Sequence, residues 1–496
     1  MKILVLQLAR LGDIYQSWPT LNALKRNNPE AEIHLLTRSA FSAAAPKFVD
    51  RHWHLDTKKI LRPLIDERPN VDQALNEMSS LVEELRAEHF DRIINLSYSP
   101  FSASLVFDLA RLRKCEVVGY TRYPDRTLAI PDDTSAYFYA QVGVGKGNRV
   151  HLVDLFAHTA GVTLTDDDWK FDIAGLSATS TAASASASGD SVVTAAGRGG
   201  LVVHLGASTL AKTLSWSKWL QVVKGLLAST DVPVILVGSS DEVDIAEKVS
   251  SVFGSRQPIN LVGRTSLNEL FAIIGSASLV IGGDSAPVQM ASLTNTPVFN
   301  LSFPMVSLWE TGPRSTGSRI LSLESEDSYT SDEIVREIAA TVAGTPPTLD
   351  VIRVAGRMLP YVETKPQPQQ FEWDLIRALY MGELFPPQPN STFGIGIQRL
   401  DEVNTLAVEQ LATLRKDSKN QTASLILDRV DDVMNQIMNL VPETAPLIRW
   451  FRIERLRIAP MHVAALIDLT HAVHFRLGEV IGLYVERGET NENVSL

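Results

Sequence analysis

A glycine and a carboxylate follow the first apolar segment of the chain. Residues 1–6 have the short apolar character of a buried parallel strand, Arg-Leu-Gly-Asp follows at 10–13, and a helical pattern begins at residue 14. Ligands of open α/β sheets bind outside the carboxyl ends of the strands. A glycine there lets the backbone approach a ligand, and a carboxylate can accept a proton. Two interpretations of Asp13 stay open on these residues alone: a cap of the helix, or a general base.

A second candidate site follows a strand pattern at 278–281 and the glycine at 282. The next four residues can line a ligand site: Gly283, Asp284, Ser285 and Ala286. Pro287 suits the first turn of a helix, and a helix N-terminus attracts phosphate through its unpaired N–H groups and its dipole. The pattern fits a diphosphate site, and it fits a structural helix cap equally well.

A lysine follows another strand pattern, at 201–205. Gly-Ala-Ser comes next at 206–208, and Lys212 lies four positions beyond. A lysine there can neutralise a diphosphate as a point charge, although most lysines after strands only face solvent. The sequence lacks the Walker pattern Gly-x-x-x-x-Gly-Lys-Ser/Thr, which argues against P-loop chemistry. Its ten histidines and one cysteine show no zinc spacing, so we expect neither a metal nor a cofactor.

The composition is that of a globular protein, with 45% hydrophobic and 21% charged residues. A formal net charge of −11 argues against nucleic acid as a partner, because phosphate binding needs a basic surface. Cys115, the only cysteine, excludes an intrachain disulfide and fits a cytoplasmic location. No apolar stretch approaches the roughly 18 residues of a membrane helix, so any membrane contact is expected to be peripheral, at the inner face.

Strand and helix patterns alternate in two runs, which predicts two parallel sheets with helices on both faces. The small polar residues between the runs predict a linker. Helical patterns at 400–414, 424–440 and 447–483 follow a proline-rich region and include a cluster of arginines, which is either a solvated face or a docking surface. The expected division is an N-terminal Rossmann-like acceptor domain, a linker, a Rossmann-like donor domain and a helical extension, at 1–173, 174–190, 191–345 and 346–496.

With these segments in order, the chain resembles the ADP-heptose:lipopolysaccharide heptosyltransferase family, whose enzymes have the GT-B fold. The opening strand through Gly12 and Asp13 resembles the N-terminal signature of that family. Four further segments resemble its donor-binding motifs: Gly206 and Ser208 to Lys212 for phosphate, Glu242 for ribose, Gly263 for the adenine-side turn, and Gly283 to Ala286 for the acid-hydroxyl motif. The chain departs from the family where Ala286 replaces glycine and Gln289 replaces histidine, and 346–496 has no counterpart in a typical member.

The resemblance implies an α/β protein with two Rossmann-like domains facing across a cleft, and an inverting, metal-independent glycosyltransferase. A heptose would move from an ADP-sugar, which is a substrate and not a cofactor, to a hydroxyl of a glycan or a lipopolysaccharide core. Asp13 would be the base, with Arg10 and Gly12 on the acceptor side. The donor side would comprise Lys212, which stabilises the leaving diphosphate, Asp284 on sugar hydroxyls, Glu242 on the ribose, and Gln289.

Two alternatives stay open. In the first, the enzyme modifies a protein, and the C-terminal helices dock the polypeptide or mediate oligomerisation. In the second, which Ala286 and Gln289 keep open, the chain is a degenerate GT-B protein that binds a nucleotide sugar or a partner without catalysis. Acceptors in the form of a glycan, a lipid-linked sugar or a protein are all compatible with the residues.

Overall fold

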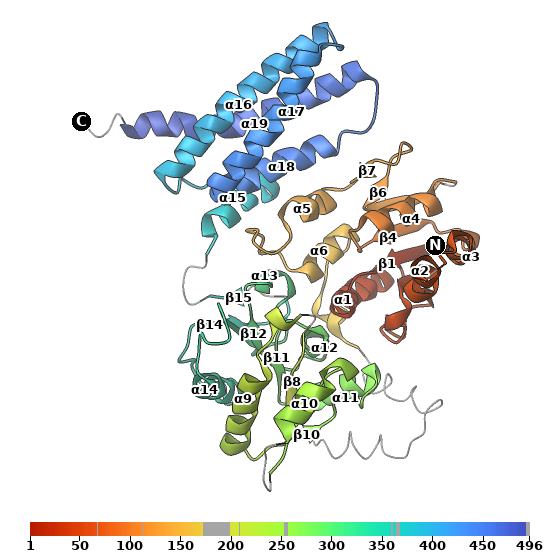
Figure 1. The fold of residues 1–496 in the computed structure, drawn as a ribbon, viewed down its shortest axis with the longest axis vertical. Coiled ribbons are helices and arrows are strands. Elements are labelled where there is room, and N and C mark those ends of the chain that lie inside the picture. Colours follow the sequence, from red (N-terminus) through yellow and green to blue (C-terminus); the bar gives the residue numbers. More distant parts are fainter. Residues whose placement is uncertain are drawn as a thin grey trace. The chain divides into compact units, whose positions relative to one another are not determined.

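The computed structural model describes residues 1–66, 68–112, 114–171, 199–207, 209–251, 256–358, 361–363 and 368–492 (Figure 1). The chain divides into two compact units, Met1–Ser97 with Val150–Pro366, and Tyr98–Arg149 with Gln367–Leu496. The expected linker at 174–190 and the donor-side residue Ser208 lie outside the described residues.

The first unit begins with a parallel sheet whose strands lie in the order β3-β2-β1-β4. Its strands are β1 (Lys2–Leu6), β2 (Glu32–Arg38), β3 (Arg51–Leu55) and β4 (Arg92–Asn95). The helices of this part are α1 (Leu11–Asn27), α2 (Thr57–Ile65), α3 (Val71–Ala87) and α6 (Leu152–Thr159). Apolar side chains fill β1 from Ile3 to Leu6 and are fully buried, because a strand inside a parallel sheet is covered on both faces.

A second sheet in the same unit has the order β10-β9-β8-β11-β12-β13-β14-β15. Its parallel strands are β8 (Leu201–His204), β9 (Val234–Val237), β10 (Ile259–Asn260), β11 (Leu279–Gly282), β12 (Val298–Ser302) and β13 (Arg319–Ser322). The antiparallel strands β14 (Val351–Val354) and β15 (Tyr361–Val362) extend it past the expected boundary at 345.

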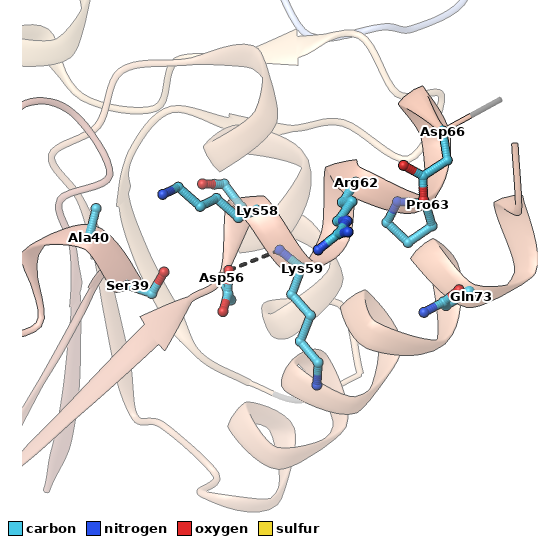
Figure 2. Close-up of a pocket in the computed structure, with 10 residues that line it drawn as sticks. Ser39, Ala40, Asp56, Lys58, Lys59, Arg62, Pro63, Asp66 and Gln73 are labelled. Carbon is cyan, nitrogen blue, oxygen red and sulfur yellow. Dashed lines mark hydrogen bonds between the residues drawn. The ribbon is translucent and has the colours of Figure 1, made fainter.

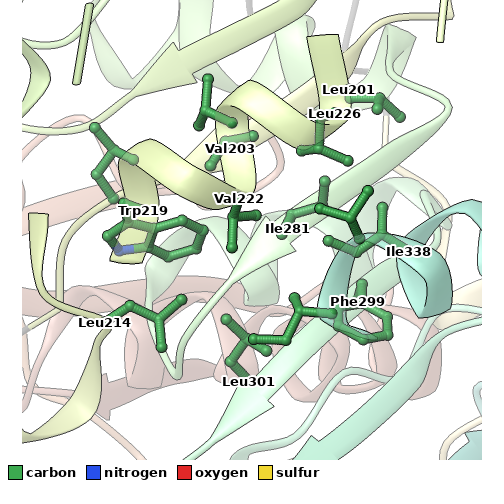
Figure 3. Packing of buried hydrophobic residues seen from close by; sticks show 14 of the residues in the cluster. Leu201, Val203, Leu214, Trp219, Val222, Leu226, Ile281, Phe299, Leu301 and Ile338 are labelled. Atoms are coloured by element: carbon green, nitrogen blue, oxygen red, sulfur yellow. The ribbon is translucent and has the colours of Figure 1, made fainter. Parts of the chain in front are cut away.

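Helices of this second half are α9 (Trp216–Ser229), α10 (Val243–Ser250), α11 (Leu267–Ser276), α12 (Ala286–Thr294), α13 (Leu308–Thr311) and α14 (Ser331–Val342). Figure 3 shows how Trp219 and Val222 of α9 pack against Ile281 of β11 in the buried core. This core holds the ends of β8 and β11 in place, and the loops that follow those ends carry the predicted donor-side residues.

The second unit contains α4 (Pro100–Ala110), β5 (Glu116–Gly119), β6 (Thr121–Arg122), β7 (Leu128–Ala129) and α5 (Asp133–Gln141), together with α15 (Gln370–Met381), α16 (Ser391–Lys416), α17 (Gln421–Leu440), α18 (Ala445–Leu456) and α19 (Val463–Glu492). Ile453 of α18 is buried against Ala103 and Tyr120. Residues 98–149, expected in the N-terminal domain, therefore share a core with the C-terminal helices.

The structure confirms two parallel Rossmann-like sheets and a helical C-terminal region. The helical pattern predicted over 447–483 is divided between α18 and α19. Pro460 lies between them, and proline ends a helix because it has no N–H to donate and its ring clashes with the preceding turn. No helix among the described residues is long and apolar enough to span a membrane.

Candidate functional site

The N-terminal ends of α1 and α12 meet, so the site predicted after β1 lies against the site predicted after β11. A Cβ atom on Gly12 would lie 3.7 Å from Cγ of Gln289 and 3.9 Å from Cα of Ala286. These are ordinary van der Waals distances, which means that the two backbones approach to within one side-chain atom. The loop that follows β1 therefore lies against the loop that follows β11.

Asp13 caps α1 and also faces the charged groups of the opposite loop. Its Oδ2 accepts the Arg10 backbone N–H at 2.9 Å, and Oδ1 has no hydrogen-bond partner among the described residues. Burial raises the pKa of the Asp13 carboxyl, and the Asp284 carboxylate raises it further, whereas the Arg10 N–H and the Lys212 ammonium oppose the rise. Capping and proton transfer are thus compatible, because they use different oxygens of one carboxylate.

Lys212 and Asp284 form a half-buried ion pair, with 3.6 Å between Nζ and Oδ2. The side chains are 14% and 19% exposed, so both charged groups can still be reached by a ligand. Burial raises the pKa of the Asp284 carboxyl, and the neighbouring Lys212 ammonium and a hydrogen bond from Thr311 oppose the rise. A ligand phosphate could share the Lys212 ammonium with Asp284, because a lysine ammonium has three donors.

Gly283 allows this pairing by letting the two loops touch. A Cβ atom there would clash with the main-chain carbonyl oxygen of Lys212, and backbone cannot move aside as a flexible side chain can. The loop after β8 is therefore pressed directly onto the loop after β11.

Gly283→Ala should lower the melting temperature and weaken binding of ADP, because the clash separates Lys212 from α12. The expected destabilisation is about 1–3 kcal/mol, the usual cost of an overpacked site. Gly12→Ala is the matched control, because its added methyl group meets only contacts at 3.7 Å or more. Thermal unfolding with and without ADP tests the pair, and equal stabilities of the two variants would contradict the steric role of Gly283.

The start of α12 has no side-chain cap. Ser285, at the N-cap position, makes no side-chain capping bond, and its hydroxyl instead donates to the Gly283 carbonyl at 3.2 Å. Pro287 has no N–H, and Val288 donates its N–H to the Ser285 carbonyl at 3.1 Å, so the first turn offers a ligand only the Ala286 N–H. The phosphate role of this segment stays a prediction.

Glu242 lies across the ends of β8 and β9. Ser239 donates both its backbone N–H and its hydroxyl to Oε2, the latter at 2.7 Å. A Cβ atom on Gly206 would clash with this carboxylate, and one on Gly238 would lie 2.9 Å from Oε2. Gly263, in the next loop, has a φ of +69°, which favours glycine. The carboxylate thus covers two glycines at the strand ends, in the same loop region as Lys212.

Gln289 is buried, and its Nε2 donates to the Thr311 carbonyl at 2.5 Å. Its amide is thereby held by the protein, while its Cγ contacts the Gly12 region. His204, at the end of β8, is almost fully buried, and burial lowers its pKa to about 4. Both side chains are thus buried beside the site, and the donor-side role of Gln289 stays a prediction.

A hollow that the sequence did not predict lies beside the first sheet, where β2 and β3 end (Figure 2). Its volume is about 710 Å³. Asp56 caps α2 by accepting the Lys59 N–H at 2.9 Å, which turns the first two turns of α2 toward the hollow. Lys59 is paired with Glu77, whereas Lys58 and Arg62 make no ion pair with any residue the structure describes. The signal that could have found them is the run of cations after a strand, Lys-Lys at 58–59 with Arg62.

Two Rossmann-like sheets, with charged residues where β1 and β11 end, give this chain the GT-B fold. The family model "Glycosyltransferase family 9 (heptosyltransferase)" matches residues 78–333. The chain therefore belongs to glycosyltransferase family 9.

The individual proteins that this chain resembles are distant from it in sequence. A putative glycosyltransferase of Haemophilus influenzae is 22% identical over 304 residues, which cover 60% of this chain and 80% of that protein. Lipopolysaccharide heptosyltransferase 3 of Escherichia coli K12 is 23% identical over 312 residues, 58% of this chain and 79% of that protein. A family 9 glycosyltransferase of Veillonella parvula matches with a TM-score of 0.53 at 15% identity, over 69% of this chain and 98% of that one. The structure of the E. coli heptosyltransferase WaaC with ADP matches with a TM-score of 0.50 at 15% identity, over 69% of this chain and 100% of that one. These structural likenesses show the fold.

Proposed function

We propose that this enzyme is an inverting, metal-independent heptosyltransferase that moves a heptose from an ADP-sugar to an acceptor hydroxyl of a glycan or a lipopolysaccharide core. The observation that carries the proposal is the meeting of the Asp13 carboxylate with the Lys212–Asp284 pair and the uncapped start of α12. Membership of family 9 and the lipopolysaccharide heptosyltransferase among its relatives support the choice of sugar and acceptor.

The reaction would be a single displacement at the anomeric carbon, which inverts its configuration. The acceptor oxygen forms the new bond as the bond from the anomeric carbon to the diphosphate oxygen breaks, and ADP leaves with the electron pair. Asp13 Oδ1 would accept the proton of the attacking hydroxyl. Lys212 and the Ala286 N–H at the start of α12 would stabilise the charge that grows on the diphosphate. Asp284 would bind hydroxyls of the sugar, and Glu242 those of the ribose.

A direct test is the incubation of the purified chain with ADP-heptose and a truncated lipopolysaccharide core. Release of ADP together with a product of inverted anomeric configuration, measured by NMR, is the expected result. Binding of ADP without any transfer to a glycan or protein acceptor would instead support a degenerate binding module, which the substitutions at Ala286 and Gln289 keep open.

We also propose that the hollow beside β2 and β3 binds an anionic group of the acceptor. Lys58 and Arg62 point their cationic groups into this open volume and make no ion pair within the described ranges, so a carboxylate or phosphate of the acceptor could pair with them.

Lys58→Ala with Arg62→Ala should raise the KM for a charged acceptor about tenfold and leave the KM for the donor unchanged, because two exposed charge contacts are lost. Steady-state kinetics with each substrate varied in turn measures both constants. The control is Lys224→Ala, which removes an exposed lysine of α9 away from the hollow and should leave both KM values unchanged. An unchanged acceptor KM in the double variant would refute the anion site.

A further inference from the structure

The C-terminal helices contain a groove whose chemistry the glycosyltransferase site does not use. The groove lies in the second unit, has a volume of about 450 Å³ and is lined by residues of α16 and α19. These two helices run side by side (Figure 1). The arginine cluster predicted as a possible docking surface is a different feature. Arg452, Arg455 and Arg457 of α18 are bonded to Asn435, Asp431 and Asp133 and are thus engaged within the unit.

The floor of this groove is a buried pair of polar side chains, Asn404 and His474. The Asn404 amide donates from Nδ2 to the His474 carbonyl at 3.1 Å, which turns Oδ1 toward the ring, 2.8 Å from Nδ1. Since Oδ1 can only accept, Nδ1 must carry the proton, and Nε2 of the neutral ring is an acceptor. Burial holds the pKa of His474 at about 4, so the neutral form prevails near pH 7. Nε2 has no hydrogen-bond partner among the described residues, although His474 is only 1% exposed.

The walls add two carboxylates and an apolar rim. Asp401 of α16 and Glu479 of α19 line the groove and make no ion pair with any residue in the described ranges. Phe475 is 61% exposed and Leu483 38% exposed on the same helix, at positions separated by two turns. The charged groups of the groove are therefore both carboxylates, and apolar surface lies beside them.

We infer that this groove docks a polypeptide segment that presents a lysine or arginine next to apolar side chains. The cation would lie between Asp401 and Glu479 and donate toward Nε2 of His474, while the apolar side chains of the segment cover Phe475 and Leu483. A cation is selected because two carboxylates and no lysine or arginine are among the residues that line the groove, and a polypeptide is selected over a small cation because exposed apolar surface flanks the charges. Gly482 leaves the wall open, since a Cβ atom there would meet nothing within 4 Å.

The inference can be tested with the full chain and two labelled synthetic helical peptides of fourteen residues, one made of leucine and lysine and the other of leucine and glutamate. Fluorescence anisotropy should show binding of the lysine peptide and none of the glutamate peptide. Asp401→Asn with Glu479→Gln should weaken the lysine peptide about tenfold, because two charge contacts are lost. Gly482→Leu, which fills the groove and leaves its charges in place, should weaken it similarly.

A control is needed because an acidic protein attracts any cationic peptide. Glu409→Gln with Asp428→Asn removes the same number of exposed carboxylates from α16 and α17 outside the groove and should leave binding unchanged. Equal binding by the groove and control variants would overturn the inference. A concentration-dependent dimer that the groove variants abolish would overturn it as well, since the occupant would then be a second copy of the chain. Transfer to a glycan acceptor tests the proposed function separately, because none of these variants touches the first unit.

Discussion

Asp13→Asn should reduce the turnover number for heptose transfer by at least about a thousandfold, within the range for loss of a general base, and should leave the affinity for ADP nearly unchanged. Asparagine can still accept the Arg10 N–H as a helix cap, so the variant removes the proton acceptor without removing the cap. Transfer kinetics and calorimetry with ADP measure the two effects. A variant with wild-type turnover would show that Asp13 only caps α1 and is not the general base.

A matched control separates capping from catalysis. Glu333 accepts the Thr330 N–H at the start of α14, in a capping box away from the site. Glu333→Gln should leave transfer unchanged. The pH dependence adds a second readout: a base must be ionised, and burial raises the pKa of Asp13, so activity should fall as the pH drops through a value above that of an ordinary aspartate. In Asp13→Asn this acid limb should be absent from the residual activity.

Lys212→Met should weaken ADP binding and lower kcat/KM about a hundredfold to a thousandfold, the usual loss when one group that stabilises a leaving oxyanion is removed. The substitution also leaves Asp284 without its ammonium partner, so the anion at α12 would meet an uncompensated carboxylate. Calorimetry with ADP and steady-state kinetics measure the two effects.

The control is Lys218→Met on α9, a lysine whose Nζ donates to the Tyr329 carbonyl in the same part of the fold. It should bind and turn over the donor as the wild type does. If Lys212→Met also kept its donor affinity and turnover, Lys212 would be a structural partner of Asp284 and the diphosphate would have to be held elsewhere. A double variant with Asp284→Asn identifies the source of any loss, because it removes the unpaired carboxylate together with the ammonium.

Local patterns in the sequence determined the elements and the segments that carry the candidate site. Strand β1 with Asp13, the loop with Lys212 and the start of α12 are each defined by a few neighbouring residues: apolar runs, glycines and a proline. Those short-range signals were enough to predict two Rossmann-like sheets, and the family followed from the resemblance of the motifs to those of known enzymes. The catalytic role of Asp13 and the donor-side roles stay predictions, because placement shows which groups meet and not what they do.

The tertiary structure alone decided which elements share a core and which loops touch. Nothing local to residues 98–149 indicates that they pack with α18, because periodicity gives the apolar face of an element but not its partner. The same holds for the close approach of Gly283 to Lys212, for the hollow near Arg62, and for the groove above His474. Each of these depends on contacts between residues distant in the chain, which form only when the whole chain packs.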